Sequence, residues 1–164
     1  MTGSTLPAVK ARLVDVLRGL DPDVPAYWTW PGVEQVWSDM GGSHFDRVEA
    51  CWLEQPTEAA VSYMALGGVR KQREETYEQI VCFGVQDAGE SSSGQVVEER
   101  ALALFSLFEH EIAGDPLLPG ADLAAGQQLL EVRIASWAID SGPFESSGNA
   151  AVVAARVRVW ATLA

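Results

Sequence analysis

Apolar residues recur at helical spacing in two segments of the chain. Between Pro7 and Leu20 the stripe consists of Val9, Leu13, Val16, Leu17 and Leu20. Between Val97 and Ile112 it consists of Val97, Ala101, Leu104, Phe108 and Ile112, with Phe105 on its flank. Residues three and four positions apart lie on one face of a helix. The spacing therefore predicts two amphipathic helices, each ended by a segment that contains glycine and proline.

Alternation of apolar and polar residues predicts four strands. They cover residues 47–54, 75–86, 129–139 and 151–163. Successive side chains of a strand point to opposite faces of its sheet, so each strand has one apolar face. The first two strands are expected to pair as a hairpin with an extended tip. A loop rich in Gly, Ser and Asn, residues 141–149, is expected between the last two, and the short V-E-Q-V-W-S-D segment is expected to be extended.

This order of elements indicates the fold class. We expect an α+β domain with a mostly antiparallel sheet, two main helices packed on one face and a long hairpin loop. No repeat or domain boundary is visible, so residues 1–164 are expected to form a single domain. A chain of 164 residues that is 48% hydrophobic can bury roughly 70% of its unfolded surface.

Charge singles out one segment of the chain. The formal net charge is −12, yet three of the eleven Lys and Arg residues lie within four positions. These are Arg70, Lys71 and Arg73, and they follow Gly67 and Gly68 in the L-G-G-V-R-K-Q-R segment. A basic loop with a glycine hinge on an acidic body favours docking over catalysis. The overall acidity argues against nucleic-acid binding, which needs clustered positive charge.

Titratable residues give no pattern of catalysis or metal binding. His44 lies near Ser43 and Asp46, but adjacency in sequence does not assemble a triad. His110 is interpreted as a solvated helix residue. Cys51 and Cys82 are interpreted as buried reduced thiols, because no C-x-x-C spacing or neighbouring His indicates a metal site. Since phosphate-loop, nucleophile-elbow and zinc-hydrolase motifs are also missing from the sequence, we expect no enzyme and no cofactor.

Aromatic residues near the N-terminus allow two interpretations. Tyr27, Trp28 and Trp30 precede Pro31 and Gly32. They favour plugging of the core, and stacking on a small ligand is the alternative. No apolar run approaches the length of about 18 residues that a membrane span needs, so we expect a soluble protein that is cytoplasmic when made.

The last strand has a mixed face that favours a partner. Arg156, Arg158 and Trp160 alternate there with an apolar face. Arginine and tryptophan are enriched at protein interfaces. A solvated face with one exposed tryptophan is the alternative interpretation.

Several motifs together resemble the tail-terminator family of long-tailed bacteriophages, in the form found in phages of actinobacteria. They are the opening amphipathic helix, the W-P-G turn followed by E-Q-V-W, the L-G-G-V-R-K-Q-R-E-E-T-Y-E-Q-I-V-C-F-G-V hairpin, the helix that ends in G-D-P-L-L-P-G, and the closing V-R-V-W-A-T-L-A strand. The likeness covers nearly the whole chain. It consists of an order of elements with short motifs and contains no active-site signature.

The resemblance implies a structural function in the virion. Members of the family form a hexameric ring that caps the tail tube, ends its polymerisation and offers the surface that joins the head. The implied partners are further copies of the chain, the tail-tube protein and a head-completion or connector protein, assembled in the host cytoplasm and placed at the tail–head junction. DNA would pass through an acidic bore without specific binding. The alternatives are a head–tail connector, a tail-tube subunit or a small-ligand-binding domain.

Overall fold

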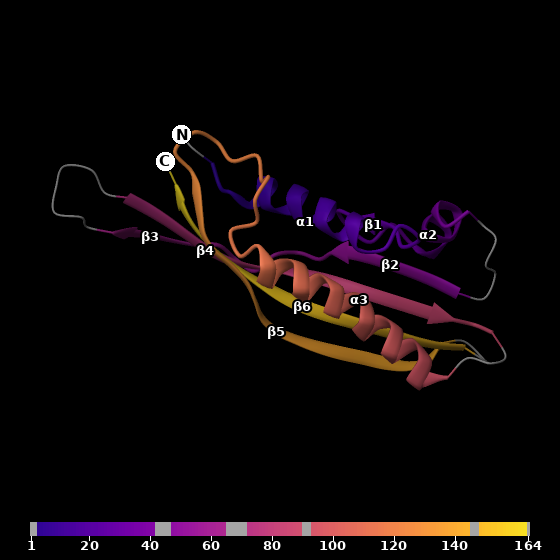
Figure 1. Cartoon of the computed structure of the whole chain (residues 1–164). Coiled ribbons are helices and arrows are strands. Elements are labelled where there is room, and N and C mark those ends of the chain that lie inside the picture. Colours follow the sequence, from indigo (N-terminus) through magenta and orange to yellow (C-terminus); the bar gives the residue numbers. More distant parts are fainter. Residues whose placement is uncertain (1–2, 42–46, 65–71, 90–92, 145–147, 164) are drawn as a thin grey trace.

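The computed structural model describes residues 3–41, 47–64, 72–89, 93–144 and 148–163 (Figure 1). In chain order the elements are α1 (Leu6–Leu20), β1 (Ala26–Tyr27), α2 (Val33–Asp39), β2 (Arg47–Leu53), β3 (Ala60–Met64), β4 (Gln72–Asp87), α3 (Gly94–Gly114), β5 (Gln128–Phe144) and β6 (Gly148–Leu163). The α+β class and the two main helices on one face of the sheet are confirmed.

The described strands form one six-stranded sheet in the order β1-β2-β4-β6-β5. All neighbours are antiparallel except β1 and β2. The short β3 pairs with the first residues of β4, on the same edge of β4 that β2 occupies further along. Because β3 and the start of β4 extend past the helices, they form an arm that projects from the body (Figure 1). The expected pairing of residues 47–54 with 75–86 is confirmed as the β2–β4 pair.

The helix-covered face of the sheet builds the main core. Helices α1 and α3 lie side by side on this face (Figure 1). Their stripes pack against the apolar faces of the central strands, as the alternation predicted. Buried strand residues in this core include Cys51, Leu53, Tyr77, Val81, Phe83, Val153, Ala155, Val157 and Val159. Phe83 contacts the rings of Phe105 and Phe108, with centroids 5.9 and 5.4 Å away.

The opposite face, which we call the open face, is covered at one end only by the described residues. There Val36 of α2 packs on Ala50, Trp52 and Cys82. The expectation that this V-E-Q-V-W-S-D segment is extended was wrong. Val33, Val36 and Trp37 follow helical spacing, and the helix uses it to bury Val36 completely.

Three of the four predicted strands are longer than their patterns indicated, and β2 ends one residue earlier, at Leu53. Strand β4 begins at Gln72, β5 continues to Phe144, and β6 begins at Gly148. Most of the loop expected at residues 141–149 is therefore strand. Polar and glycine residues are tolerated there because the strand ladder can satisfy their backbone groups, and the register continues through the pairs of Ser141 with Ala151 and Gly142 with Ala150.

Buried hydrogen bonds fix the start of α1 to the base of the arm. The Glu75 carboxylate accepts bonds from the amide and the hydroxyl of Thr5, both at 2.9 Å. Thr5 Oγ1 also lies 3.2 Å from the hydroxyl of Tyr77. Glu75 is only 2% exposed, so its two bonds offset part of the cost of burying a carboxylate. They connect the first helix to the strand from which the arm extends.

Candidate interaction surfaces

The basic segment is described only at its end. Gly67, Gly68, Arg70 and Lys71 lie outside the described residues. Arg73 belongs to β4, where it pairs with Tyr63 of β3 and Leu163 of β6. The loop expected from Ala65 to Glu75 is therefore strand from Gln72 onward, a correction that follows from the pairing of β3 with β4.

Arg156, Arg158 and Trp160 lie together on the open face of β6, as the alternation predicted. Acidic residues of β4 accompany them. The indole N–H of Trp160 donates to Glu74 at 3.0 Å, and Arg156 Nη1 lies 3.4 Å from Glu78 Oε2. This patch therefore carries both signs of charge and is not a purely basic surface.

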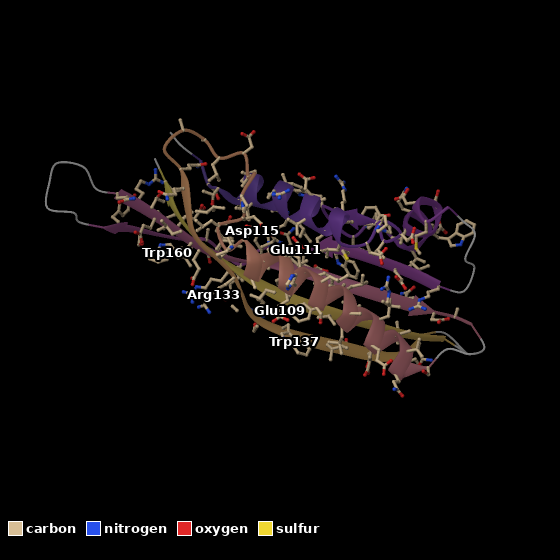
Figure 2. The ribbon with its side chains drawn as sticks, in the orientation of Figure 1. Glu109, Glu111, Asp115, Arg133, Trp137 and Trp160 are labelled. Atoms are coloured by element: carbon tan, nitrogen blue, oxygen red, sulfur yellow. The ribbon has the colours of Figure 1, made fainter. Side chains whose placement is uncertain are left out.

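A shallow hollow of about 280 Å³ lies in the same patch. Glu74, Thr76, Glu131, Arg158 and Trp160 line it. Strands β4, β5 and β6 each contribute to it, and Arg133 of β5 lies close by, 3.2 Å from Glu131 (Figure 2). Such mixed charge with an indole suits a polar protein contact better than a dry pocket.

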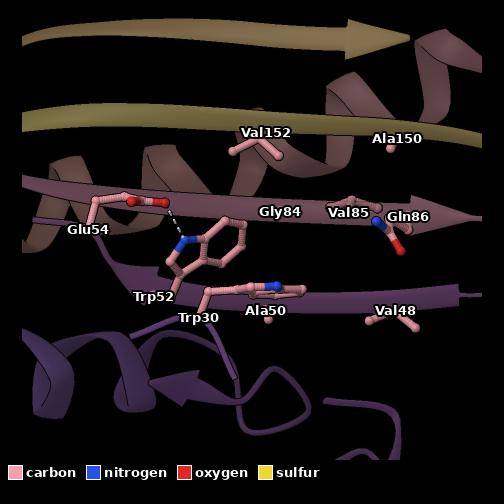
Figure 3. Close-up of a pocket in the computed structure, with 10 residues that line it drawn as sticks. All are labelled: Trp30, Val48, Ala50, Trp52, Glu54, Gly84, Val85, Gln86, Ala150 and Val152. Atoms are coloured by element: carbon pink, nitrogen blue, oxygen red, sulfur yellow. Dashed lines mark hydrogen bonds between the residues drawn. The ribbon is translucent and has the colours of Figure 1, made fainter. Parts of the chain in front are cut away.

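A second hollow, of about 300 Å³, lies on the open face at the other end of the sheet (Figure 3). Trp30 and Trp52 form one wall, with ring centroids 4.6 Å apart. The indole N–H of Trp52 donates to Glu54 at 3.0 Å. Glu54 and Gln86 also line the hollow, and small and aliphatic residues complete the lining: Val48, Ala50, Gly84, Val85, Ala150 and Val152.

Two of the three N-terminal aromatics do not plug the core as expected, whereas Tyr27 packs against the cluster of Val36, Ala50, Trp52 and Cys82. Trp28 and Trp30 are 46% and 39% exposed. Lys10 lies 4.6 Å from the ring centroid of Trp28, a cation–π contact on the surface. Tyr27 is half-buried and donates to Asp39 at 2.5 Å; burial and this carboxylate raise its pKa. Trp30 lines the hollow described above.

Two edges of the sheet carry exposed apolar side chains. On the arm, Val61 and Tyr63 of β3 are 45% and 63% exposed. On β5, Trp137 and Ile139 are 48% and 37% exposed, and Trp137 contacts Phe105 with centroids 5.3 Å apart. Clustered exposed aromatic and aliphatic residues typically mark contact surfaces.

An ion-pair network at Arg100 is structural. Its guanidinium bonds both oxygens of Glu49 at 2.9 to 3.1 Å and Asp21 at 2.8 Å. Arg47 lies 2.8 Å from the same Glu49. The network joins α3 to β2 and to the end of α1. Hydrogen bonding with Arg100 lowers the pKa of Asp21, and the carboxylates raise the pKa of Arg100.

Titratable side chains form no catalytic cluster that the described residues reveal. His110 is exposed on α3, which confirms its interpretation as solvated. Its sequence neighbours Glu109 and Glu111 lie on the same helix (Figure 2). His44 and its neighbours lie outside the described residues. No group of three His, Cys, Asp or Glu residues in the described part could hold a metal ion, and no helix there is long and apolar enough to cross a membrane.

Cys51 and Cys82 are buried free thiols, as expected. They belong to the paired strands β2 and β4 but point to opposite faces, because Cys82 is opposite Trp52 and Cys51 is opposite Phe83. Burial raises the pKa of each thiol to about 12. Neither is therefore poised as a nucleophile.

Comparisons with known proteins find weak likenesses of fold among solved structures. No family model matches the chain, and no curated protein matches it significantly. A matching solved structure is a chain from the virion of a native gene transfer agent (GTA) particle. The identity is 13% and the TM-score 0.45, over 95% of this chain and 97% of that chain. At these values the likeness carries no argument about function.

Sequence reasoning missed β3 and therefore the arm edge. The A-V-S-Y-M run does alternate, with Val61 and Tyr63 on one side, but it is short and lies in a segment that was interpreted as a connection. The wall residue Trp52 was assigned correctly to a strand face. Its contact with Trp30 depends on the path of the chain before α2, which no local pattern specifies.

Proposed function

We propose that this chain is a phage tail terminator. Copies of it form a ring, hexameric by the family resemblance, that caps the tail tube, ends its polymerisation and presents the surface that joins the head. The ring would lie at the tail–head junction of the virion after assembly in the host cytoplasm. Its partners are further copies, the tail-tube protein and a head-completion or connector protein.

One observation supports the ring above others: in the part of the chain that the structure describes, the sheet has two unlike edges that pair with no further strand. The arm edge at β3 and the edge at β5 differ in length, position and side chains. When one surface of a subunit binds a different surface of the next, the contact repeats by rotation and closes into a ring if the angle allows. A subunit with two such edges suits this head-to-tail arrangement.

The basic segment is the second element of the proposal. Arg70, Lys71 and Arg73 are proposed to meet acidic surface on the next subunit or on the tube. Changing all three to Glu should abolish capping, because the segment would repel a partner surface of the same sign. Arg18→Glu, on the exposed side of α1, is the control. Normal capping and head joining by the triple variant would show that the segment has another role.

The bore of the ring is proposed to be lined by Asp and Glu. DNA passes through such a bore without being held, since like charges repel. A ring structure with a basic bore would remove this element and leave the capping role intact.

The direct test of the function is tail length. Tubes assembled from tail-tube protein with the chain present should have a defined end and join heads, and tubes without it should grow past their normal length. Electron microscopy of both preparations measures this. Equal length distributions with and without the chain would contradict the proposed function.

Other functions would give different results in that test. A tail-tube subunit would polymerise into long filaments by itself, and a connector would bind heads in the absence of tubes. A small-ligand-binding domain is favoured by one observation, the hollow with Trp30 and Trp52 in its wall. It would stay monomeric, and a bound ligand would quench tryptophan fluorescence.

A further inference from the structure

We propose that β3 of one copy pairs antiparallel with β5 of a second copy, so that the sheet continues from subunit to subunit. The inference rests on the proposed function, because it names the contact that would close the ring. The occupant of the β5 edge is thus the arm of a second copy.

Both strands are edges. Among the described residues β5 pairs with β6 alone, and β3 pairs with β4 alone. Each therefore presents a row of backbone N–H and C=O groups that another strand can bind. Strand β2 does not offer the same opportunity near its end, because β1 pairs there with Cys51 and Trp52.

Side chains on the two edges match by face. Val61 and Tyr63 are opposite Glu75 and Arg73 of β4, on the helix-covered side of the sheet. Trp137 and Ile139 are opposite Ala155 and Val153 of β6, on the same side. When two copies join with that side in common, the exposed apolar residues of the arm meet those of β5. Aromatic and β-branched neighbours across a strand pair stabilise it.

Charge is also compatible with this pairing. Residues 59–64 and 134–139 contain no charged side chain, in a chain with a formal net charge of −12. Copies of such an acidic chain repel one another over most of their surface. These two edges can approach without placing carboxylates opposite each other. A pairing of Tyr63 with Trp137 would put Ser62 opposite Ala138.

Chain direction agrees with a repeating contact. Going across the sheet from β3 through β4 and β6 to β5, every neighbour is antiparallel. The β3 strand of a next copy in the same orientation therefore runs antiparallel to β5. Tyr63 is directly opposite Arg73 of β4. Trp137 is opposite Ala155 of β6, which is in turn opposite Val81 of β4, eight residues further along that strand than Arg73. Neighbouring copies must then be staggered by about 27 Å along the strands, which a ring accommodates by tilting its strands, as a barrel does.

The contact area indicates weak binding by any single pair. Tyr63 and Trp137, at 63% and 48% exposure, each have on the order of 100 Å² left to bury, since a whole aromatic side chain buries about 150–250 Å². Stable interfaces bury roughly 1,200–2,000 Å² in total. We therefore expect assembly at high concentration or on a tube end, where every copy uses both edges.

A complementation experiment tests the pairing. Tyr63→Asp disables the arm and Ile139→Asp disables the β5 edge; Ile139 is chosen over Trp137 because Trp137 contacts Phe105. Val33→Asp, an exposed apolar position on α2, is the matched control. Circular dichroism and thermal melts establish that each variant is folded. Light scattering over a range of concentrations, with and without tail tubes, measures the size of the assemblies.

We expect the wild type and Val33→Asp to assemble and each edge variant alone to remain monomeric. An equimolar mixture of the two edge variants should stop at dimers, because one intact β3–β5 contact remains per pair. Assembly of Tyr63→Asp at wild-type concentration, assemblies larger than dimers in the mixture, or a wild type that stays monomeric even on tubes would each overturn the proposal. Loss of assembly in Ile139→Asp but not in Tyr63→Asp would also overturn it, since that result indicates that β5 pairs with the β5 of another copy.

The outcome separates the pairing from the function. If wild-type copies assemble through these edges but tube length does not change, the tail-terminator role fails and the pairing stands. If both edge variants cap tubes normally, the pairing fails and the role stands. As an independent check, Ser62→Cys combined with Ala138→Cys should give a ladder of oxidised oligomers, whereas Ser62→Cys combined with Ser106→Cys, on exposed α3, should not.

Discussion

Gly84 is the position where one methyl group should disturb the open face. A Cβ on Gly84 would lie 2.6 Å from Trp52 Cζ3 and 2.7 Å from Cη2, against a normal carbon contact of about 3.5–4.0 Å. The ring has little freedom to move away. Trp52 is 8% exposed, donates to Glu54 and contacts the ring of Trp30. Gly84→Ala therefore forces a shift in the wall of the hollow.

The expected loss of stability follows from two opposing terms. Overpacking lowers the free energy of unfolding by about 1–3 kcal/mol, and replacing a strand glycine by alanine raises it by about 0.5–1 kcal/mol. The net loss should be about 1–2 kcal/mol, or a decrease in Tm of about 2–8 °C for a chain of this length. Urea unfolding followed by circular dichroism measures it, with Gly142→Ala in β5 as control, because no atom lies within 4 Å of the added Cβ there.

A double-mutant cycle assigns the loss to the ring. In a Trp52→Val background the overlap is gone, so Gly84→Ala should cost at least about 1 kcal/mol less than in the wild type. If Gly84→Ala were as stable as Gly142→Ala, the close packing of Trp52 over Gly84 and the shape of the hollow would both be refuted.

Two further predictions concern ionisable groups. Arg100→Met should lower stability by about 2–3 kcal/mol, less than the 3–5 typical of a fully buried pair because Arg47 still pairs with Glu49. The pKa of Asp21 is lowered in the folded state, so the stability that its ion pair contributes is complete above the unfolded pKa of about 3.9 and is lost as the pH falls through the folded pKa. Urea titrations from pH 7 to 3 should therefore show a smaller loss of stability with falling pH in Arg100→Met than in the wild type. An equal loss in both proteins would contradict the network. Cys51 and Cys82, with pKa values of about 12 in the fold, should resist iodoacetamide at pH 8.5 and react once urea unfolds the chain, since an unfolded thiol has a pKa of about 8.5. Unfolding then releases protons, so stability should fall as the pH rises above about 8.5; rapid alkylation of the native protein would show that these thiols are accessible.

Much of the fold could be predicted from the sequence because its long elements have consistent periodicity. The α3 stripe and the alternation of β6 each extend over more than ten residues, and every member of those two patterns is buried where expected. The α2 segment was misassigned because seven residues with valines and a tryptophan also have strand propensity. Its helical state depends on burying Val36 against Ala50 and Trp52, a tertiary contact.

The candidate surfaces were predictable only in part. The alternation of β6 placed Arg156, Arg158 and Trp160 on one face, but their acidic neighbours Glu74 and Glu78 follow from the β4–β6 register, which local sequence does not specify. The arm edge was missed because β3 alternates over only five residues and is stabilised by the β4 residues opposite it. The β5 edge is defined by where the sheet ends, a property of topology.

Cryo-electron microscopy of tail tubes assembled with this chain tests the central claim most directly. The account predicts one closed ring of this chain at the tube end, with β3 of each copy beside β5 of the next and no further layer above it. Stacked layers of the chain, an open filament, or tube ends that carry no density for it would contradict the account.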